Sequence, residues 1–218
     1  MIEPFAMLLA LLPLIGYLLI LGSIRVLGQT LVTTGSRDIA ALGVAISGLV
    51  AIGPMELFFP NAAATVFGPW VWVALIAFYS LLVALVALTS TPKLVIYGRT
   101  PDELYKPLLA ASQRIDSKAK AIDGLRVHLP SVGVHFRLDG YRDVDFAQVI
   151  AFEPGVPSRV WAKLLAGLRD ELQELPAPAT RHGHVMLLFA GLLIGILLWQ
   201  GIGNSEQVVQ GFREWLWR

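Results

Sequence analysis

The sequence predicts an α-helical membrane protein: a four-span bundle with a small two-layer α+β domain inserted between the third and fourth spans. Three observations lead to this prediction. Of the 218 residues, 56% are hydrophobic and only 15% are charged, whereas a typical soluble domain has ~25% charged residues. Four stretches are apolar and long enough to cross ~30 Å of hydrocarbon. Between the third and fourth of these, residues 93–176 have the mixed periodicity of a soluble domain with the element order βαβββα.

The spans are expected at residues 4–24, 39–59, 70–90 and 184–202. The membrane region then comprises residues 1–92 and, after a linker that begins at residue 177, continues to residue 203. The first stretch lacks the basic region that precedes the apolar part of a signal peptide, so we interpret it as a retained helix. Residues 204–218 have apolar side chains on one side and charged ones on the other, which predicts an amphipathic helix in the membrane interface.

The distribution of lysine and arginine predicts the orientation of these spans. Thirteen of them lie between Lys93 and Arg181, whereas the N-terminal tail and residues 61–69 contain none. Because cytoplasmic connections carry an excess of Lys and Arg, we expect residues 93–181 in the cytoplasm and both termini outside. A bacterial cytoplasmic membrane is the expected location.

Small residues recur at helical spacing on three of the spans, a pattern that lets helix backbones approach closely. The pattern is compatible with packing inside one bundle and with an interface to another subunit, and the sequence leaves both interpretations open. The positions concerned are Gly43, Ser47 and Ala51 in the second span, Ala77, Ser80 and Ala84 in the third, and Gly191 and Gly195 in the fourth.

Glu56 is the one acidic residue predicted inside a span, and it follows Pro54. A proline breaks the helical hydrogen-bond ladder, so a carboxylate beside it can meet freed backbone donors, an ion or a proton. The alternative is that Glu56 lies about one turn from the outer end of its helix and reaches water among the headgroups. No second charged residue lies in the interior of a span, which disfavours a proton or ion relay.

The inserted domain is predicted element by element. A strand at 94–97 is followed by a helix that begins at the Thr100-Pro101-Asp102-Glu103 start signal and ends at Asp123-Gly124. Two alternating strands, 125–129 and 134–138, flank a turn at 130–133. A strand at 147–152 and an amphipathic helix at 158–175 complete the domain, and residues 139–145 are interpreted as a surface loop.

The turn at 130–133 predicts that residue 128 pairs with residue 135 and residue 126 with residue 137, so that Arg126, His128, His135 and Arg137 share the polar face. Facing arginines repel unless something neutralises them. Local salt bridges, for example to Asp139, are one solution. An anionic lipid surface or an acidic partner is the other. A metal at the histidine pair would need a third ligand, and none is adjacent in sequence, so no metal site is predicted. His182 and His184 are expected to meet headgroups.

The remaining observations concern function. With no cysteine and none of the nucleotide-binding, hydrolase or kinase motifs, the sequence predicts no catalytic residues and no cofactor. A net charge of +1 gives no indication of nucleic-acid binding. The favoured hypothesis is a non-catalytic membrane subunit, scaffold or assembly component, with lipids and other membrane subunits or a second copy as partners. The alternatives are a transporter or channel component that uses Glu56, and a membrane enzyme with a metal at His128 and His135.

Overall fold

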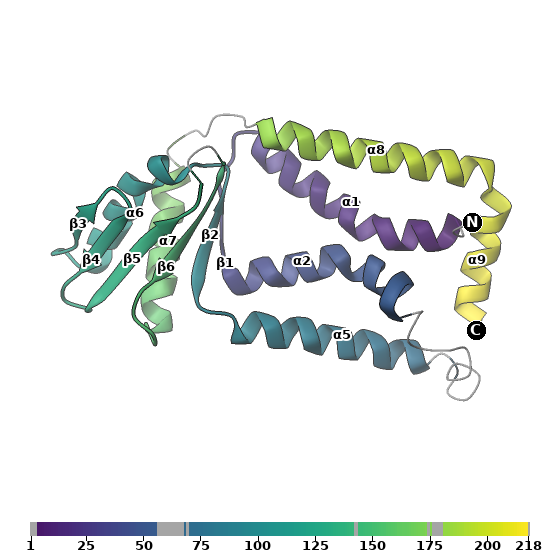
Figure 1. Ribbon diagram of the computed structural model, residues 1–218, viewed down its shortest axis with the longest axis horizontal. Helices are drawn as coiled ribbons and strands as arrows, with labels where there is room; N and C mark the ends of the chain where they lie inside the picture. The colour runs from purple at the N-terminus through teal and green to yellow at the C-terminus, as the bar shows by residue number, and fades with distance from the viewer. Residues whose placement is uncertain are drawn as a thin grey trace. The chain divides into compact units, whose positions relative to one another are not determined.

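The computed structural model describes residues 4–55, 68, 70–141, 144–173, 175 and 181–217 (Figure 1). The chain forms two compact units. One consists of Met1–Leu21, Ile39–Thr89 and Val185–Arg218, and the other of Gly22–Asp38 and Ser90–His184. The second unit is therefore discontinuous, because the connection between the first two long helices belongs to it.

The first unit is helical. It contains α5 (Trp70–Thr89), α9 (Ser205–Trp217) and most of α1 (Pro4–Val26), α2 (Gly35–Val50) and α8 (Arg181–Gly203), whose remaining ends belong to the second unit. Four helices of the described residues are long and apolar enough to cross a membrane, and they span Pro4–Val26, Gly35–Pro54, Trp70–Thr89 and His182–Gly203. The tail forms the predicted helix, α9, and its Phe212 ring makes an edge contact with Phe5 at 5.9 Å between centroids.

Pro54 interrupts the regular helix as its chemistry requires. The α-helical part of α2 ends at Val50, and Ala51–Met55 form a π-helical turn that contains Pro54. Proline has no N–H to donate and its ring clashes with the preceding turn, so the chain widens locally. Glu56, the next residue, lies outside the residues that the structure describes, so its predicted role remains a hypothesis.

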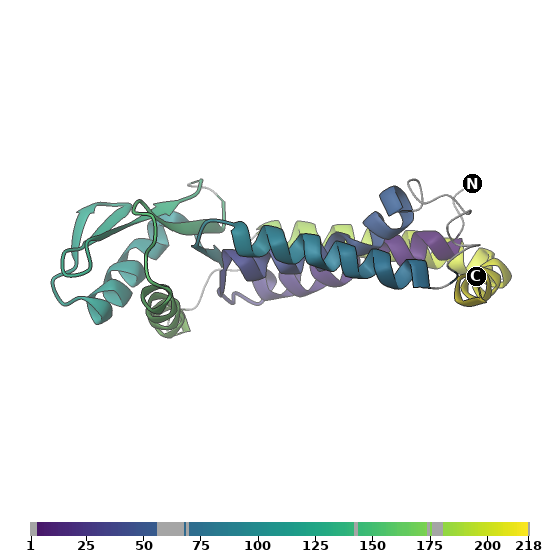
Figure 2. The same ribbon diagram turned by 90° about the horizontal axis from the view of Figure 1, so that it is seen from below.

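The second unit contains a six-stranded antiparallel sheet in the order β1-β2-β6-β5-β4-β3. Its strands are β1 (Leu31–Thr34), β2 (Lys93–Tyr97), β3 (Lys120–Asp123), β4 (Arg126–Leu129), β5 (Val134–Asp139) and β6 (Phe146–Ala151). Helices α6 (Pro101–Ile115) and α7 (Ser158–Gln173) cover one face of the sheet (Figure 2).

A single apolar core lies between the sheet and these two helices. Each strand from β4 to β6 contributes alternate residues to it, as expected for a sheet with one covered face, and Val32 of β1 joins them. The Phe136 ring packs edge-on against Trp161 of α7, with 5.2 Å between ring centroids. The largest fully buried side chains are Phe136, Leu94, Ile96, Leu104, Leu108, Leu129, Leu138, Leu164 and Leu168, together with Val95, Val127 and Val149.

The predicted order βαβββα is wrong in two places. Helix α6 ends at Ile115 instead of Asp123, because the Asp116 carboxylate accepts hydrogen bonds from the backbone of Lys118 and Ser131 and terminates the helix. Residues Lys120–Asp123 then form β3, and the hairpin turn at Gly124-Leu125 follows where a helix stop was expected. The other omission is β1, whose residues Leu31–Thr34 were expected to be only a connection between spans.

The predicted register between β4 and β5 is confirmed. Leu129 pairs with Val134, His128 with His135, and Arg126 with Arg137. This register places the two histidines and two arginines together on the sheet face opposite α6 and α7.

Candidate functional site

Arg126, His128, His135 and Arg137 form a polar surface on β4 and β5 that we call the histidine–arginine face. The alternation of each strand buries Val127, Leu129, Val134 and Phe136 and turns these four side chains the other way. The two imidazole rings are stacked, with 4.1 Å between centroids and 6° between planes. Lys120 of β3 is the cross-strand neighbour of His128 and extends the row.

The structure gives three of these four side chains an acidic neighbour. Arg126 lies 2.6 Å from an oxygen of Asp123, and Arg137 lies 3.7 Å from an oxygen of Asp139, as the local salt-bridge interpretation expected. His135 Nδ1 lies 2.5 Å from Glu153 Oε1. The repulsion between the arginines is therefore offset within the chain. Binding of an anionic surface by this face stays a prediction. The unbalanced repulsion between Arg126 and Arg137 that first suggested it is not found.

Glu153 holds His135 at two points. Its Oε2 accepts a hydrogen bond from the His135 backbone N–H at 2.7 Å, while Oε1 contacts the ring nitrogen Nδ1. Desolvation acts to raise the pKa of the Glu153 carboxyl, but the hydrogen bonds from His135 outweigh it and hold that pKa below its ordinary value. When Nδ1 carries the proton, Nε2 is left as an acceptor, which is how carboxylates orient histidines for ligand binding. The described residues contain no group of three or more His, Asp or Glu side chains arranged to hold a metal ion.

A pH titration tests this arrangement. Since the pKa of Glu153 is lowered by folding, its stabilising contribution is present above the ordinary pKa of about 4.5 and is lost as the pH falls below it. We expect Glu153→Gln to lower the stability of the sheet unit at pH 7 by less than about 1 kcal/mol, because the pair is partly exposed. The difference from wild type should shrink below pH 4 in thermal unfolding. Glu206→Gln, at an exposed site on α9, is the control; an equal effect there would contradict the assignment.

A second polar cluster centres on a buried ion pair that no pattern in the sequence indicated. Asp145, only 4% exposed, directly precedes β6, with 3.4 Å between its Oδ1 and Arg25 at the end of α1. His182 Nδ1, in the first turn of α8, is 2.9 Å from the same oxygen. The interpretation of residues 139–145 as a surface loop is therefore wrong for Asp145. His182 has a carboxylate partner in addition to any headgroup.

Tyr97 and Asp38 extend this cluster. The Tyr97 hydroxyl donates a hydrogen bond of 2.8 Å to Asp38 in the first turn of α2, and the Arg25 guanidinium lies 5.2 Å from the centroid of the Tyr97 ring. The cluster joins the sheet to the chain at the ends of three long helices. Its members therefore act as structural connections.

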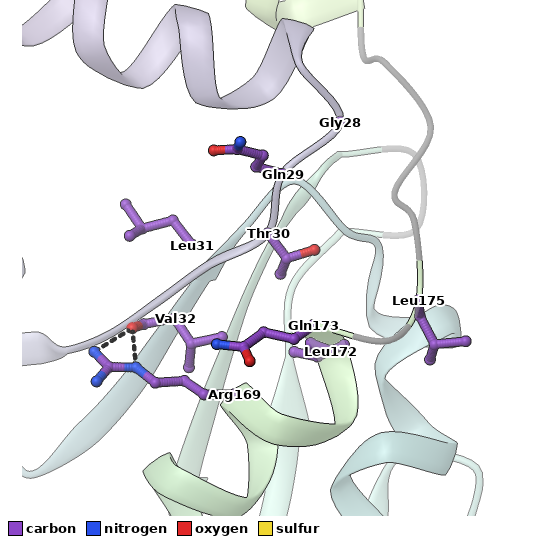
Figure 3. A pocket seen from close by; sticks show the side chains of 9 residues that line it. All are labelled: Gly28, Gln29, Thr30, Leu31, Val32, Arg169, Leu172, Gln173 and Leu175. Atoms are coloured by element: carbon purple, nitrogen blue, oxygen red, sulfur yellow. Dashed lines mark hydrogen bonds between the residues drawn. The ribbon is translucent and has the colours of Figure 1, made fainter.

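A cavity of about 590 Å³ lies between the segment Gly28–Val32 and the C-terminal part of α7 (Figure 3). Arg169 projects from α7 and donates two hydrogen bonds to the Val32 carbonyl, from Nε at 3.2 Å and from a terminal nitrogen at 2.9 Å. β1 is an edge strand of the sheet, and Arg169 covers it at Val32. The other lining residues are Gln29, Thr30, Leu31, Leu172, Gln173 and Leu175.

The small residues of the long helices divide into two groups. A Cβ on Gly43 would lie 2.7 Å from Val83, and one on Gly48, which was not among the predicted packing residues, would overlap the backbone oxygen of Leu9. The Tyr79 hydroxyl also donates a hydrogen bond of 2.6 Å to the Gly43 carbonyl. These contacts join α2 to α1 and α5. Gly43, Ser47, Ala51, Ser80 and Ala84 line an apolar cavity of about 620 Å³, whereas Ala77 is exposed.

Gly191 and Gly195 of α8 belong to the other group. A Cβ at either position would meet no described atom within 4 Å, so the described residues leave this pair uncovered. In the most apolar 18-residue stretch of α8, 6% of the residues are buried, and the share in α5 is the same.

In comparisons with known proteins, no protein-family model, curated protein or solved structure matches this chain.

Proposed function

We propose that this chain is a non-catalytic multi-pass membrane subunit, in which four helices cross the bilayer and carry a small α+β domain on its cytoplasmic side. The helices at Pro4–Val26, Gly35–Pro54, Trp70–Thr89 and His182–Gly203 support the membrane location by length and composition. The excess of Lys and Arg between residues 93 and 181 supports a cytoplasmic domain with both termini outside.

The observation that carries the proposal is the uncovered surface of α8. In lipid, helices associate through close packing of small residues, since lipid tails are as apolar as the side chains themselves. Gly43 and Gly48 already have such contacts inside the chain, whereas the space beside Gly191 and Gly195 is open. Spaced four residues apart, these two glycines lie on one side of α8. We assign this side to contact with a helix of another subunit or of a second copy.

The polar clusters of the domain favour assembly over catalysis. Arg25, Asp145 and His182 connect the ends of long helices to the sheet, and Glu153 fixes His135. Charged groups used in this way position segments of the chain. The domain then serves as a rigid platform for a partner at the membrane surface.

Cysteine labelling tests the orientation, because the chain has no cysteine of its own. Ser117, in the turn after α6, and Ser205, at the start of α9, are both exposed serines. An impermeant thiol reagent added to intact cells should label Ser205→Cys and leave Ser117→Cys unlabelled until the cells are opened. The reverse result would place the domain outside and overturn the proposed orientation. Labelling of both positions in intact cells would show that the two residues lie on the same side.

A further inference from the structure

Arg169 lines the cavity of Figure 3, and Arg99 is hydrogen-bonded to two of its other lining residues, Thr30 and Leu175. Neither arginine has an acidic partner among the described residues, which do not include Glu174. Arg99 is 6% exposed; its Nε donates a hydrogen bond of 3.0 Å to the Thr30 hydroxyl, and a terminal nitrogen donates to the Leu175 carbonyl. Arg169 donates to the Val32 carbonyl. All of these acceptors are neutral. By contrast, four other arginines, Arg25, Arg114, Arg126 and Arg137, each have a carboxylate within ion-pair distance.

Among the described residues, these two guanidinium groups have only neutral partners and therefore contribute net positive charge beside the cavity. A buried or half-buried charge is unfavourable unless a counter-charge lies close to it. Carbonyl oxygens satisfy the hydrogen-bonding groups but carry only partial charge. An anion in the cavity would supply the missing counter-charge, and guanidinium groups match the geometry of phosphate oxygens.

The cavity has the size and the polar lining that such a ligand needs. Its volume of about 590 Å³ falls in the range of small-molecule sites. The side chains of Gln29, Thr30 and Gln173 line it together with Arg169 and add neutral donors for phosphate oxygens. Leu31, Leu172 and Leu175 supply apolar wall for the uncharged part of a ligand.

The chain also fixes where this cavity lies along the sequence. Gly28 is two residues beyond the end of α1, and Val32 is three residues before the start of α2. Two residues of extended chain span about 7 Å at most. If α1 and α2 cross the bilayer, as proposed above, the cavity is held close to the headgroups on the cytoplasmic side, where anionic lipids concentrate.

We propose that this cavity binds a phosphate group through Arg169, with Arg99 adding positive charge beside Thr30 and Leu175, and that an anionic phospholipid headgroup supplies it. The membrane location of the cavity rests on the proposed function. The neutral partners of Arg99 and Arg169 are observed independently of it. The site ties the domain to the lipid surface at the connection between the first two spans.

Lipid titration of the full chain in detergent micelles tests the proposal, with phosphatidylglycerol as the probe and phosphatidylcholine as the uncharged reference. The wild type should bind phosphatidylglycerol preferentially, and Arg169→Gln should weaken that binding about tenfold, as expected for loss of one charged hydrogen-bonding partner. Arg159→Gln, an exposed arginine on the same helix, removes the same charge outside the cavity and should have no effect.

A second variant keeps the test valid if Arg169→Gln fails to fold. Gln173→Glu places a carboxylate in the cavity at an exposed position, so it should abolish preferential phosphatidylglycerol binding while raising the melting temperature. Gln113→Glu on α6 adds the same charge elsewhere and should leave binding unchanged. Equal binding by all four variants and the wild type would overturn the proposal.

Soluble phosphate separates the two sources of the ligand. Inorganic phosphate and glycerol phosphate should compete only weakly with the lipid. If either binds the wild type while phosphatidylglycerol does not, the phosphate site stands and the lipid assignment is wrong. Because the titration is done in micelles, its result is independent of the orientation that cysteine labelling measures.

Discussion

Asp145→Asn is expected to lower the free energy of unfolding of the sheet unit by about 3–5 kcal/mol, the usual cost of breaking a buried ion pair by removing one partner. The side chains of Arg25 and Asp145 are 10% and 5% exposed, so water cannot solvate the arginine once the carboxylate is gone. The variant keeps the size of the side chain, which isolates the effect of charge. Thermal unfolding of the full chain in detergent measures the loss.

Asp170→Asn is the matched control for this variant. Asp170 lies 3.2 Å from Arg114, but both side chains are more than half exposed. An exposed pair of this kind contributes at most about 1 kcal/mol. Adding Arg25→Met to Asp145→Asn should recover part of the lost stability, because it removes the unpaired charge. Equal losses for Asp145→Asn and Asp170→Asn would show that the buried cluster is not a special connection.

The double variant Gly191→Leu/Gly195→Leu is expected to abolish association of the chain with other membrane helices. A leucine at either position fills the open space beside α8 and keeps a neighbouring backbone from approaching closely. Because no described atom of the chain occupies that space, its own melting temperature should stay unchanged. The associated fraction, measured by crosslinking in native membranes, should fall at least about tenfold. The same measurement on Gly201→Leu provides the comparison.

Gly201 is the control because it lies on the same helix, and a Cβ there also meets no described atom. Gly48→Leu provides the opposite case, since it must displace the backbone of α1 at Leu9 and should destabilise the chain itself. If the Gly191→Leu/Gly195→Leu variant associates as the wild type does, the assignment of α8 as the contact helix is wrong.

Local periodicity was sufficient to predict several parts of the fold. The four long apolar helices, the helix at Ser158–Gln173 and the pairing of His128 with His135 were all predicted. Each depends on residues close together in sequence: continuous apolar stretches, a stripe with a period of 3.6 residues, or a short turn between two alternating strands. In these places local preference and tertiary packing agree.

Strands β1 and β3 depend on distant or ambiguous signals and were missed. β1 has four residues, and its one partner within the described part of the chain is β2, which lies far along the sequence. The Asp123-Gly124 pair is compatible with a helix stop and with a hairpin turn, and the choice depends on Asp116, which ends α6 by binding Ser131. The spacing of apolar residues carries no information about that hydrogen bond, because it forms between polar groups 15 residues apart.

The polar sites were predictable only in part. The sequence brought Arg126, His128, His135 and Arg137 together and suggested Asp139 as a counter-charge, but it did not anticipate Asp123 or Glu153. The Arg25–Asp145–His182 cluster and the cavity beside Arg169 each join segments that are remote in sequence. Their one local signal was charge near the ends of spans, which served only to orient the helices.

The mass of the particle extracted from the membrane tests the proposed function most directly. The chain should be released in a mild detergent and measured intact by native mass spectrometry. A subunit predicts a complex of defined stoichiometry that is heavier than the 23.7 kDa chain. That complex should contain other membrane proteins or further copies, and the Gly191→Leu/Gly195→Leu variant should reduce it to the single chain. A wild-type particle with the mass of one chain and bound lipid alone, under conditions that preserve known membrane complexes, would contradict the proposal.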